Sequence, residues 1–372
     1  MEPANNVYRP DFAIPPGETL REALEALGMT QADLARRTGL SAKHINQIIQ
    51  GSASISPDTA LALEHVVGVP ARLWNALEAN YQSQRLRQRN RTVSEEDAAW
   101  LRRLPIKELV ARGFLRATTD LADRRDQMFA FFGVASREAW EAVWVTPDAA
   151  FRRSPAFEAD PMATAAWLRI GELEAASTRV AEFERARFAA ALLEVRSLMV
   201  RPPNVFEPAM KSLLADSGVA LVIVGEVKGC RANGAARWLS PTRALIQLSV
   251  RYKWEDVFWF SFFHEAGHLL LHGKRSVFID NSRSGTPDEE EANAFAAQLL
   301  IPSEFERELL RIRDLPGAVA LAGKLGVPPG IVIGRLQREG LLSYAVGNGF
   351  RRKFDLVEDQ EPTAQAGAST AS

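Results

Sequence analysis

The sequence has a single cysteine, Cys230, which excludes an internal disulfide framework and any zinc finger built on several cysteines. Long apolar runs are also lacking. The longest near the middle, 257–263, is interrupted by Ser261 and falls well short of the roughly 18 residues of a membrane-spanning helix. The first residues lack the basic and apolar regions of a secretory signal. We therefore expect a cytoplasmic protein that does not enter a membrane.

An excess of charge of one sign is missing too: 45 Lys and Arg face 46 Asp and Glu, a net charge of −1. This balance excludes a polybasic, histone-like protein. Histidine is scarce, yet three of the five, His264, His268 and His272, fall within nine residues. The clustered histidines are therefore the first candidates for chemistry.

The 372 residues predict two or three domains, at roughly 150 residues each. Gly and Pro residues between the periodic segments divide the chain into an N-terminal arm (1–16), a module of five short helices (17–82) and an Arg-rich connector with a helical middle region (83–215). An α+β region (216–345) and a disordered tail (356–372) follow. We expect a bundle or spacer in the middle region, and a mainly α fold with a small α+β part.

The helical module contains the spacing of a helix-turn-helix. One helix is capped by Thr30 and stopped by Gly39, and after a short turn Ser41 caps the next. In such a motif the second helix enters the major groove of DNA. Polar side chains on its outer face are of the types that contact base edges.

Residues 17–81 resemble the Cro/cI-type (XRE) helix-turn-helix, particularly the antitoxin branch related to HigA. The resemblance rests on Leu-Gly-Met-Thr-Gln-Ala-Asp-Leu-Ala at 27–35, Thr-Gly-Leu-Ser at 38–41 and Ile-Asn-Gln-Ile-Ile-Gln-Gly at 45–51. It implies that Gln31 contacts phosphate. It also implies that five residues face the major groove of an operator: Ser41, Lys43, His44, Asn46 and Gln47.

Charge leaves an alternative open, a packing module that has lost DNA binding. Residues 17–82 hold five basic and seven acidic side chains, a net of −2, whereas DNA affinity depends largely on neutralising phosphates. Four arginines between 85 and 91 could supply the missing positive charge. We therefore expect weak DNA binding unless the protein forms a homodimer.

His264-Glu265-Ala266-Gly267-His268 places two histidines four residues apart, on one face of an expected helix over 254–272. Two imidazoles in this arrangement can converge on one Zn²⁺, and Glu265 beside them can take a proton from a metal-bound water. His272 lies two turns from His264, about 12 Å along the axis. That is too far to share the ion, so we expect it to support the ligands from outside or to cap the helix.

A third zinc ligand is expected downstream, where an acidic segment opens an apolar helix over 288–302. One of its carboxylates could complete the site. The alternative is that these acids merely favour the positive end of the helix dipole.

Residues 219–342 resemble the ImmA/IrrE family of zinc metallo-endopeptidases. The resemblance is carried by 246–252, by 258–272, by the Glu-Ala-Asn-Ala-Phe-Ala-Ala helix ending Leu-Ile-Pro, and by 325–336. It implies a zincin-like fold with a short sheet, zinc as cofactor, Glu289 as third ligand and a transcriptional repressor as substrate. Glu291 is the second choice for the ligand, since a shift of register among Glu289, Glu290 and Glu291 would move it.

Two apolar runs, 219–224 and 243–250, predict strands, with Asn233-Gly234 as a turn between them. Three functions remain open at this level. The first is a regulatory zinc endopeptidase fused to a DNA-binding module, with a helix-turn-helix repressor as its substrate or a HigA-like toxin–antitoxin or stress role. The second is an antitoxin-like sensor whose peptidase fold no longer hydrolyses. The third is a structural zinc site, which rarely keeps a base such as Glu265.

Overall fold

The computed structural model describes residues 14–89, 91–145, 160–249, 254–273, 278–280 and 286–354. The predicted tail and residues 1–13 of the predicted arm lie outside this part. The chain forms two compact units, residues 1–98 with 120–123, and residues 99–119 with 124–372. None of the described helices is long and apolar enough to cross a bilayer. The mainly helical fold with a small sheet is confirmed.

The first unit contains the five predicted helices: α1 (Pro16–Ala26), α2 (Gln31–Thr38), α3 (Ala42–Ile49), α4 (Pro57–Val67) and α5 (Ala71–Arg89). The predicted arm, 1–16, ends one residue too late, because α1 begins at Pro16, and proline is compatible with a first helical turn. Gly17 is required there, since a Cβ would collide with the backbone of α3 at Ile48. The first residues of the Arg-rich connector form the last turns of α5.

The second unit is built on a four-stranded mixed sheet in the order β1-β3-β2-β4. The strands are β1 (Val219–Val224), β2 (Gly234–Ser240), β3 (Arg243–Ser249) and β4 (Phe278–Asp280). β1 runs parallel to β3, and β2 pairs antiparallel with both β3 and β4. Asn233-Gly234, predicted as a turn, is therefore the entry to β2, and this prediction was wrong.

The remaining elements are helical: α6 (Glu95–Arg103), α7 (Ile106–Ala111), α8 (Leu121–Phe132), α9 (Arg137–Trp140), η1 (Glu141–Val145), α10 (Pro161–Ser177), α11 (Arg185–Leu198), α12 (Pro203–Asp216), α13 (Glu255–Leu271), α14 (Pro287–Leu300), η3 (Ser303–Phe305), α15 (Glu306–Leu309), α16 (Leu315–Leu325), α17 (Pro329–Arg338) and η4 (Asn348–Phe350).

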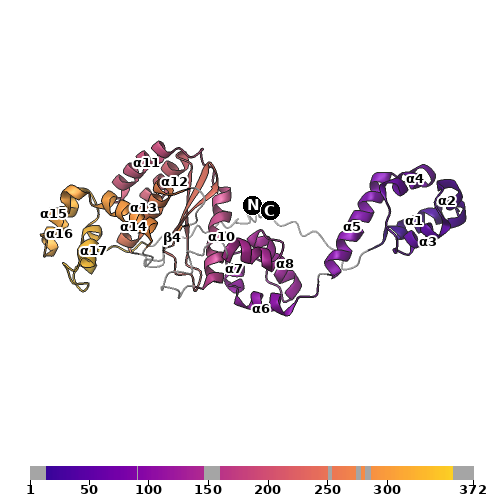
Figure 1. Ribbon diagram of the computed structural model, residues 1–372, viewed down its shortest axis with the longest axis horizontal. Coiled ribbons are helices and arrows are strands. Elements are labelled where there is room, and N and C mark those ends of the chain that lie inside the picture. Colours follow the sequence, from indigo (N-terminus) through magenta and orange to yellow (C-terminus); the bar gives the residue numbers. More distant parts are fainter. Residues whose placement is uncertain are drawn as a thin grey trace, which may run out of the picture. The chain divides into compact units, whose positions relative to one another are not determined.

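The sheet is buried on both faces, which explains why its strands are continuous apolar runs. Along β1, Val219 and Leu221 face the core formed with α11, α12 and α13, whereas Ala220 and Val222 face α10. Figure 1 shows α10 on one side of the sheet and α11 and α12 on the other. Thus residues 161–216, which we expected to form a bundle or spacer, are covering layers of the sheet.

Arg196 of α11 joins three helices of this unit. Its guanidinium donates to the carbonyl of Leu299 at 2.6 Å and to that of Leu325 at 3.1 Å, at the C-terminal ends of α14 and α16. A cation is favourable at the negative ends of two helix dipoles. Through this contact a middle-region helix fixes the helix that carries Glu289.

Candidate metal centre and DNA-binding helix

The histidine cluster lies on α13, a helix that is buried on almost every side. Such a helix is apolar all round, and aromatic residues from Phe258 to Phe263 pack its first half into the core. His264, Glu265 and His268 follow in its second half and are at most 1% exposed. Polar groups buried this deeply need partners, and α14 provides them for the two histidines.

Glu289 of α14 faces both histidines. Its carboxylate lies 3.1 Å from Nε2 of His264 and 3.5 Å from Nε2 of His268, and the two Nε2 atoms are 3.0 Å apart. Donor atoms of a tetrahedral zinc site, each about 2.0–2.1 Å from the ion, lie roughly 3.3 Å from one another. The three side chains therefore fit a zinc ion as a donor set, in both chemistry and spacing.

Both histidines are oriented through their other ring nitrogen. For each Nε2 to offer a lone pair, the proton must sit on Nδ1. His264 can then donate to Oδ1 of Asn293 at 3.1 Å, and His268 to Nδ1 of His272 at 2.9 Å. Partners of this kind fix the tautomer and raise the basicity of metal-binding histidines.

His272 is the C-cap residue of α13, and its backbone N–H donates to the carbonyl of His268. Its Nε2 lies 3.4 Å from Oε2 of Glu291 and 3.9 Å from Oδ1 of Asp288. His272 thus contacts His268, and Glu291 contacts His272. Glu289, by contrast, faces the Nε2 atoms of His264 and His268. Glu290 is exposed.

Electrostatics keeps His268 neutral. Burial, reinforced by neighbouring His264 and His272, lowers its pKa from 6.5 to about 2. Neutral imidazole is the form that binds metal, so no proton has to be displaced from the ring at physiological pH.

Glu265 is completely buried and lies next to Gly234, the first residue of β2. A Cβ on residue 234 would lie 2.8 Å from both Cγ and Oε1 of Glu265, so any residue other than glycine at this position would collide with the Glu265 side chain. This close approach, rather than a turn, explains the glycine at 234.

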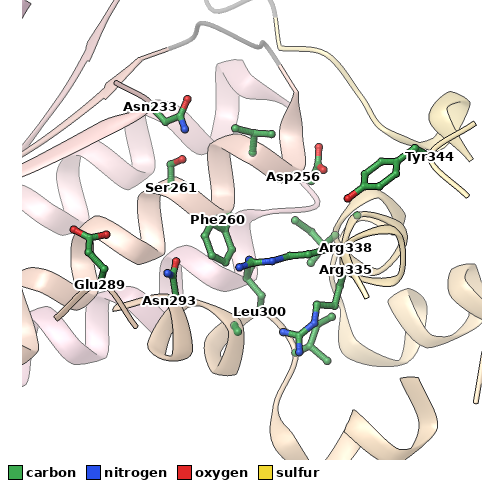
Figure 2. A pocket seen from close by; sticks show the side chains of 15 residues that line it. Asn233, Asp256, Phe260, Ser261, Glu289, Asn293, Leu300, Arg335, Arg338 and Tyr344 are labelled. Atoms are coloured by element: carbon green, nitrogen blue, oxygen red, sulfur yellow. The ribbon is translucent and has the colours of Figure 1, made fainter. Parts of the chain in front are cut away.

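A cleft of about 510 Å³ opens beside the cluster. Glu289 and Asn293 lie along it, together with residues from α13 and α17, and Figure 2 shows that their side chains border one space. The candidate metal centre is therefore connected to a hollow large enough for a stretch of peptide.

The helix-turn-helix is described within its own unit. The Thr30 hydroxyl accepts from the backbone of Asp33, and Gly39 takes a left-handed conformation, φ 75°, that ends α2. The Ser41 hydroxyl accepts from the backbone N–H of His44 and so starts α3. These contacts form the short turn that the motif requires.

On α3, Ile45 and Ile48 are buried, and the predicted DNA-contacting residues lie on the remaining surface. Ser41, Lys43 and Asn46 are exposed, whereas Gln31, His44 and Gln47 are half-buried. The Ser41 hydroxyl is engaged as the helix cap, so Lys43 and Asn46 are the side chains most available to a ligand.

Sequence reasoning missed three residues of the metal region. Asn293 lies four residues after Glu289, on the same face of α14, and that spacing was a usable signal. Gly234 was read as a turn, and Arg196 carries no local pattern. Their roles depend on contacts between elements far apart in the chain.

Comparison with known proteins gives two family matches. Residues 20–74 match the helix-turn-helix family, and residues 232–337 match the family described as the IrrE N-terminal-like domain. Virulence-associated protein I of Dichelobacter nodosus is 37% identical over 70 residues, 18% of this chain. The chain spans 65% of the length of that curated relative.

A solved structure named as an antidote protein of a plasmid maintenance system, from Nostoc punctiforme, shares 32% identity. The match covers 22% of this chain and 86% of that one, with a TM-score of 0.20.

Proposed function

Because the chain joins a helix-turn-helix DNA-binding domain to an IrrE N-terminal-like peptidase domain, we propose that it is a zinc-dependent endopeptidase that acts in transcriptional control. The observation that supports this most directly is the convergence of His264, His268 and Glu289, with Glu265 buried beside the first of them. A structural zinc site would have no use for that additional carboxylate.

The roles of the residues follow from their chemistry. Bound zinc would supply a Lewis acid and lower the pKa of a water molecule in the cleft. The Glu265 carboxylate takes a proton from the attacking water while the water oxygen forms a bond to the scissile carbonyl carbon. It then delivers that proton to the amide nitrogen as the C–N bond breaks. Asn293 and His272 hold the two histidines in the tautomer that leaves both Nε2 atoms unprotonated.

The proposed substrate is a helix-turn-helix repressor, and the proposed partner at the other end is an operator read by α3 in the major groove. The exposed Lys43 and Asn46 support the second role, since both are of types that contact phosphate or base edges. A protein of this kind would belong to a toxin–antitoxin or stress circuit, in which cleavage relieves repression.

The decisive experiment compares cells that express the wild-type chain with cells that express Glu265→Gln. New N-termini are mapped by mass spectrometry, and zinc in both purified proteins is measured by elemental analysis. We expect about one zinc per chain in both, and a cleaved repressor with the wild type alone. Zinc in both proteins with identical N-termini would instead favour a sensor that no longer hydrolyses.

A further inference from the structure

The cleft beside the metal centre is lined largely by residues of three helices, α13, α14 and α17. Since Glu289 belongs to both the cleft and the metal centre, a peptide lying in the cleft reaches the proposed site of hydrolysis.

Two of the charged groups in the cleft are already neutralised. Asp256 pairs with Arg351 at 2.8 Å. Arg335 pairs with Glu339 at 2.9 Å and lies 3.8 Å from Glu306. Neither group offers an uncompensated charge to a ligand.

Arg338 differs from them. It is exposed, and among the residues described in the structure no carboxylate lies within 4.0 Å of it. Its guanidinium carbon lies 5.6 Å from the centroid of the Phe260 ring. In Figure 2 the Arg338 side chain extends from α17 to the Phe260 ring, on the side where Asn293 also lies.

The contact with Phe260 has a consequence for recognition. A cation over an aromatic face is held in place, yet its N–H groups at the edge stay available. A guanidinium is suited to bind a carboxylate through two parallel hydrogen bonds. Arg338 is thus an oriented cation in the cleft whose counter-ion is not supplied by neighbouring side chains.

Part of the same cleft has an apolar lining. Leu300, Ile301 and Ile331 are 4%, 9% and 5% exposed, and all three line it. An apolar side chain placed there would remove its surface from water, which stabilises binding by roughly 25 cal/mol per Å².

We propose that the cleft selects peptides in which an acidic side chain lies within a few residues of an apolar one, with Arg338 binding the carboxylate and the Leu300–Ile301–Ile331 surface binding the apolar group. The inference rests on the proposed peptidase function and names its substrate class. Arg338 is then a specificity-determining residue of the site.

The test measures binding, so it does not depend on hydrolysis. Full-length Glu265→Gln protein loaded with zinc is titrated into two pools of fluorescein-labelled decapeptides. Each peptide holds one Leu in a Gly/Ala background and, one to four residues away, either Glu or Gln. Fluorescence anisotropy at low salt should show the Glu pool binding about three- to tenfold more tightly, an effect expected of a single charge pair.

Arg338→Gln in the same background should remove the preference, and Arg338→Glu should transfer it to a third pool that carries Lys. Arg335→Gln is the matched control, since this arginine lies in the same cleft and on the same helix but is already paired. It should keep the preference. Equal binding of the Glu and Gln pools, no binding of either, or a preference that survives in Arg338→Gln would each overturn the inference. Failure of the wild type to cleave any protein in cells would count against the proposed function alone.

Discussion

The two helices tied to function, α13 and α3, meet opposite demands. α13 is buried on nearly all sides and carries its chemistry into the interior, whereas α3 buries only Ile45 and Ile48 and presents its polar residues outward. In α13 the two histidines face Glu289 of α14, and Glu265 lies against Gly234 of β2. In α3 the backbone is fixed by local caps, and the outer side chains are free to meet a ligand. We therefore expect a substitution among the functional residues of α13 to disturb the whole set of metal-binding side chains, whereas a substitution on the outer face of α3 should remove a single contact with a ligand.

The largest effect is expected from breaking the constellation itself. His268→Ala should reduce zinc from about one per chain to background and hydrolysis by at least about a thousandfold, because two remaining donors rarely hold the ion. Glu265→Gln should retain zinc while losing hydrolysis to a similar degree. Elemental analysis and a cleavage assay on both variants check this, and full zinc in His268→Ala would refute the assignment of the ligands.

A second pair of variants sharpens the assignment within α14. Glu289→Ala should weaken zinc binding by roughly a hundredfold or more, because its carboxylate faces both buried nitrogens. Glu291→Ala should weaken it by roughly tenfold or less, since it acts only through His272 and is 65% exposed. Competition with a chromophoric chelator measures both. A larger loss in Glu291→Ala would exchange the two roles.

A third prediction concerns the buried start of α13. Glu255 is 0% exposed, and burial raises the pKa of its carboxyl from 4.5 to about 7, although the backbone and the positive charge of Arg352 act in the opposite direction. Between pH 4.5 and 7 the folded chain keeps a proton that the unfolded chain has released. The free energy of unfolding therefore falls as the pH rises through this range.

Glu255→Gln has no titrating carboxyl at this position, so it should not show this fall in the free energy of unfolding with rising pH. The variant should match the wild type near pH 4, where the carboxyl is mostly protonated in both states, and exceed its stability by about 3 kcal/mol near pH 8, which corresponds to the shift in pKa. Thermal unfolding of the full chain at the two pH values measures the difference, with the exposed Glu304→Gln as control. An equal gain at both pH values would mean that the effect arises from packing rather than from titration.

The smallest effect is expected on the exposed helix. Asn46→Ala should cost about 1–3 kcal/mol of binding to the specific operator and little on random DNA, if its amide reads a base edge. Asn75→Ala, an exposed asparagine on α5, is the matched control. Equal weakening on specific and random DNA would assign Asn46 to backbone positioning instead.

The same contrast explains what could be predicted from sequence. The helices of the first unit follow from capping residues and glycines that lie within a few residues of their ends. Thr30 and Gly39, for example, were sufficient to place α2, and Ser41 was sufficient to place the start of α3. The two predicted strands and the α13 and α14 helices were also placed, because long apolar runs with clear ends are local signals.

Long-range packing was not predictable in this way. Nothing in the pattern of 161–216 indicates that these helices cover a sheet whose strands come later in the chain. The close approach of Gly234 to Glu265 joins two elements separated by a whole strand, and only the folded chain shows why a glycine is needed. The four-residue spacing of Glu289 and Asn293 is a local feature of the sequence, but the contact of Asn293 with His264 joins two different helices.

The contact of Arg196 with the ends of α14 and α16 has a practical consequence for dissecting this protein. A fragment cut near residue 216 would lose Arg196, α10 to α12 and the cover on both faces of β1, and a fragment limited to 232–337 would lose β1 as well. Either should expose apolar surface and aggregate. A fragment that is to remain soluble and retain the metal centre should instead begin near residue 94, so that it keeps the whole of α6, the helix within which the second compact unit begins at residue 99.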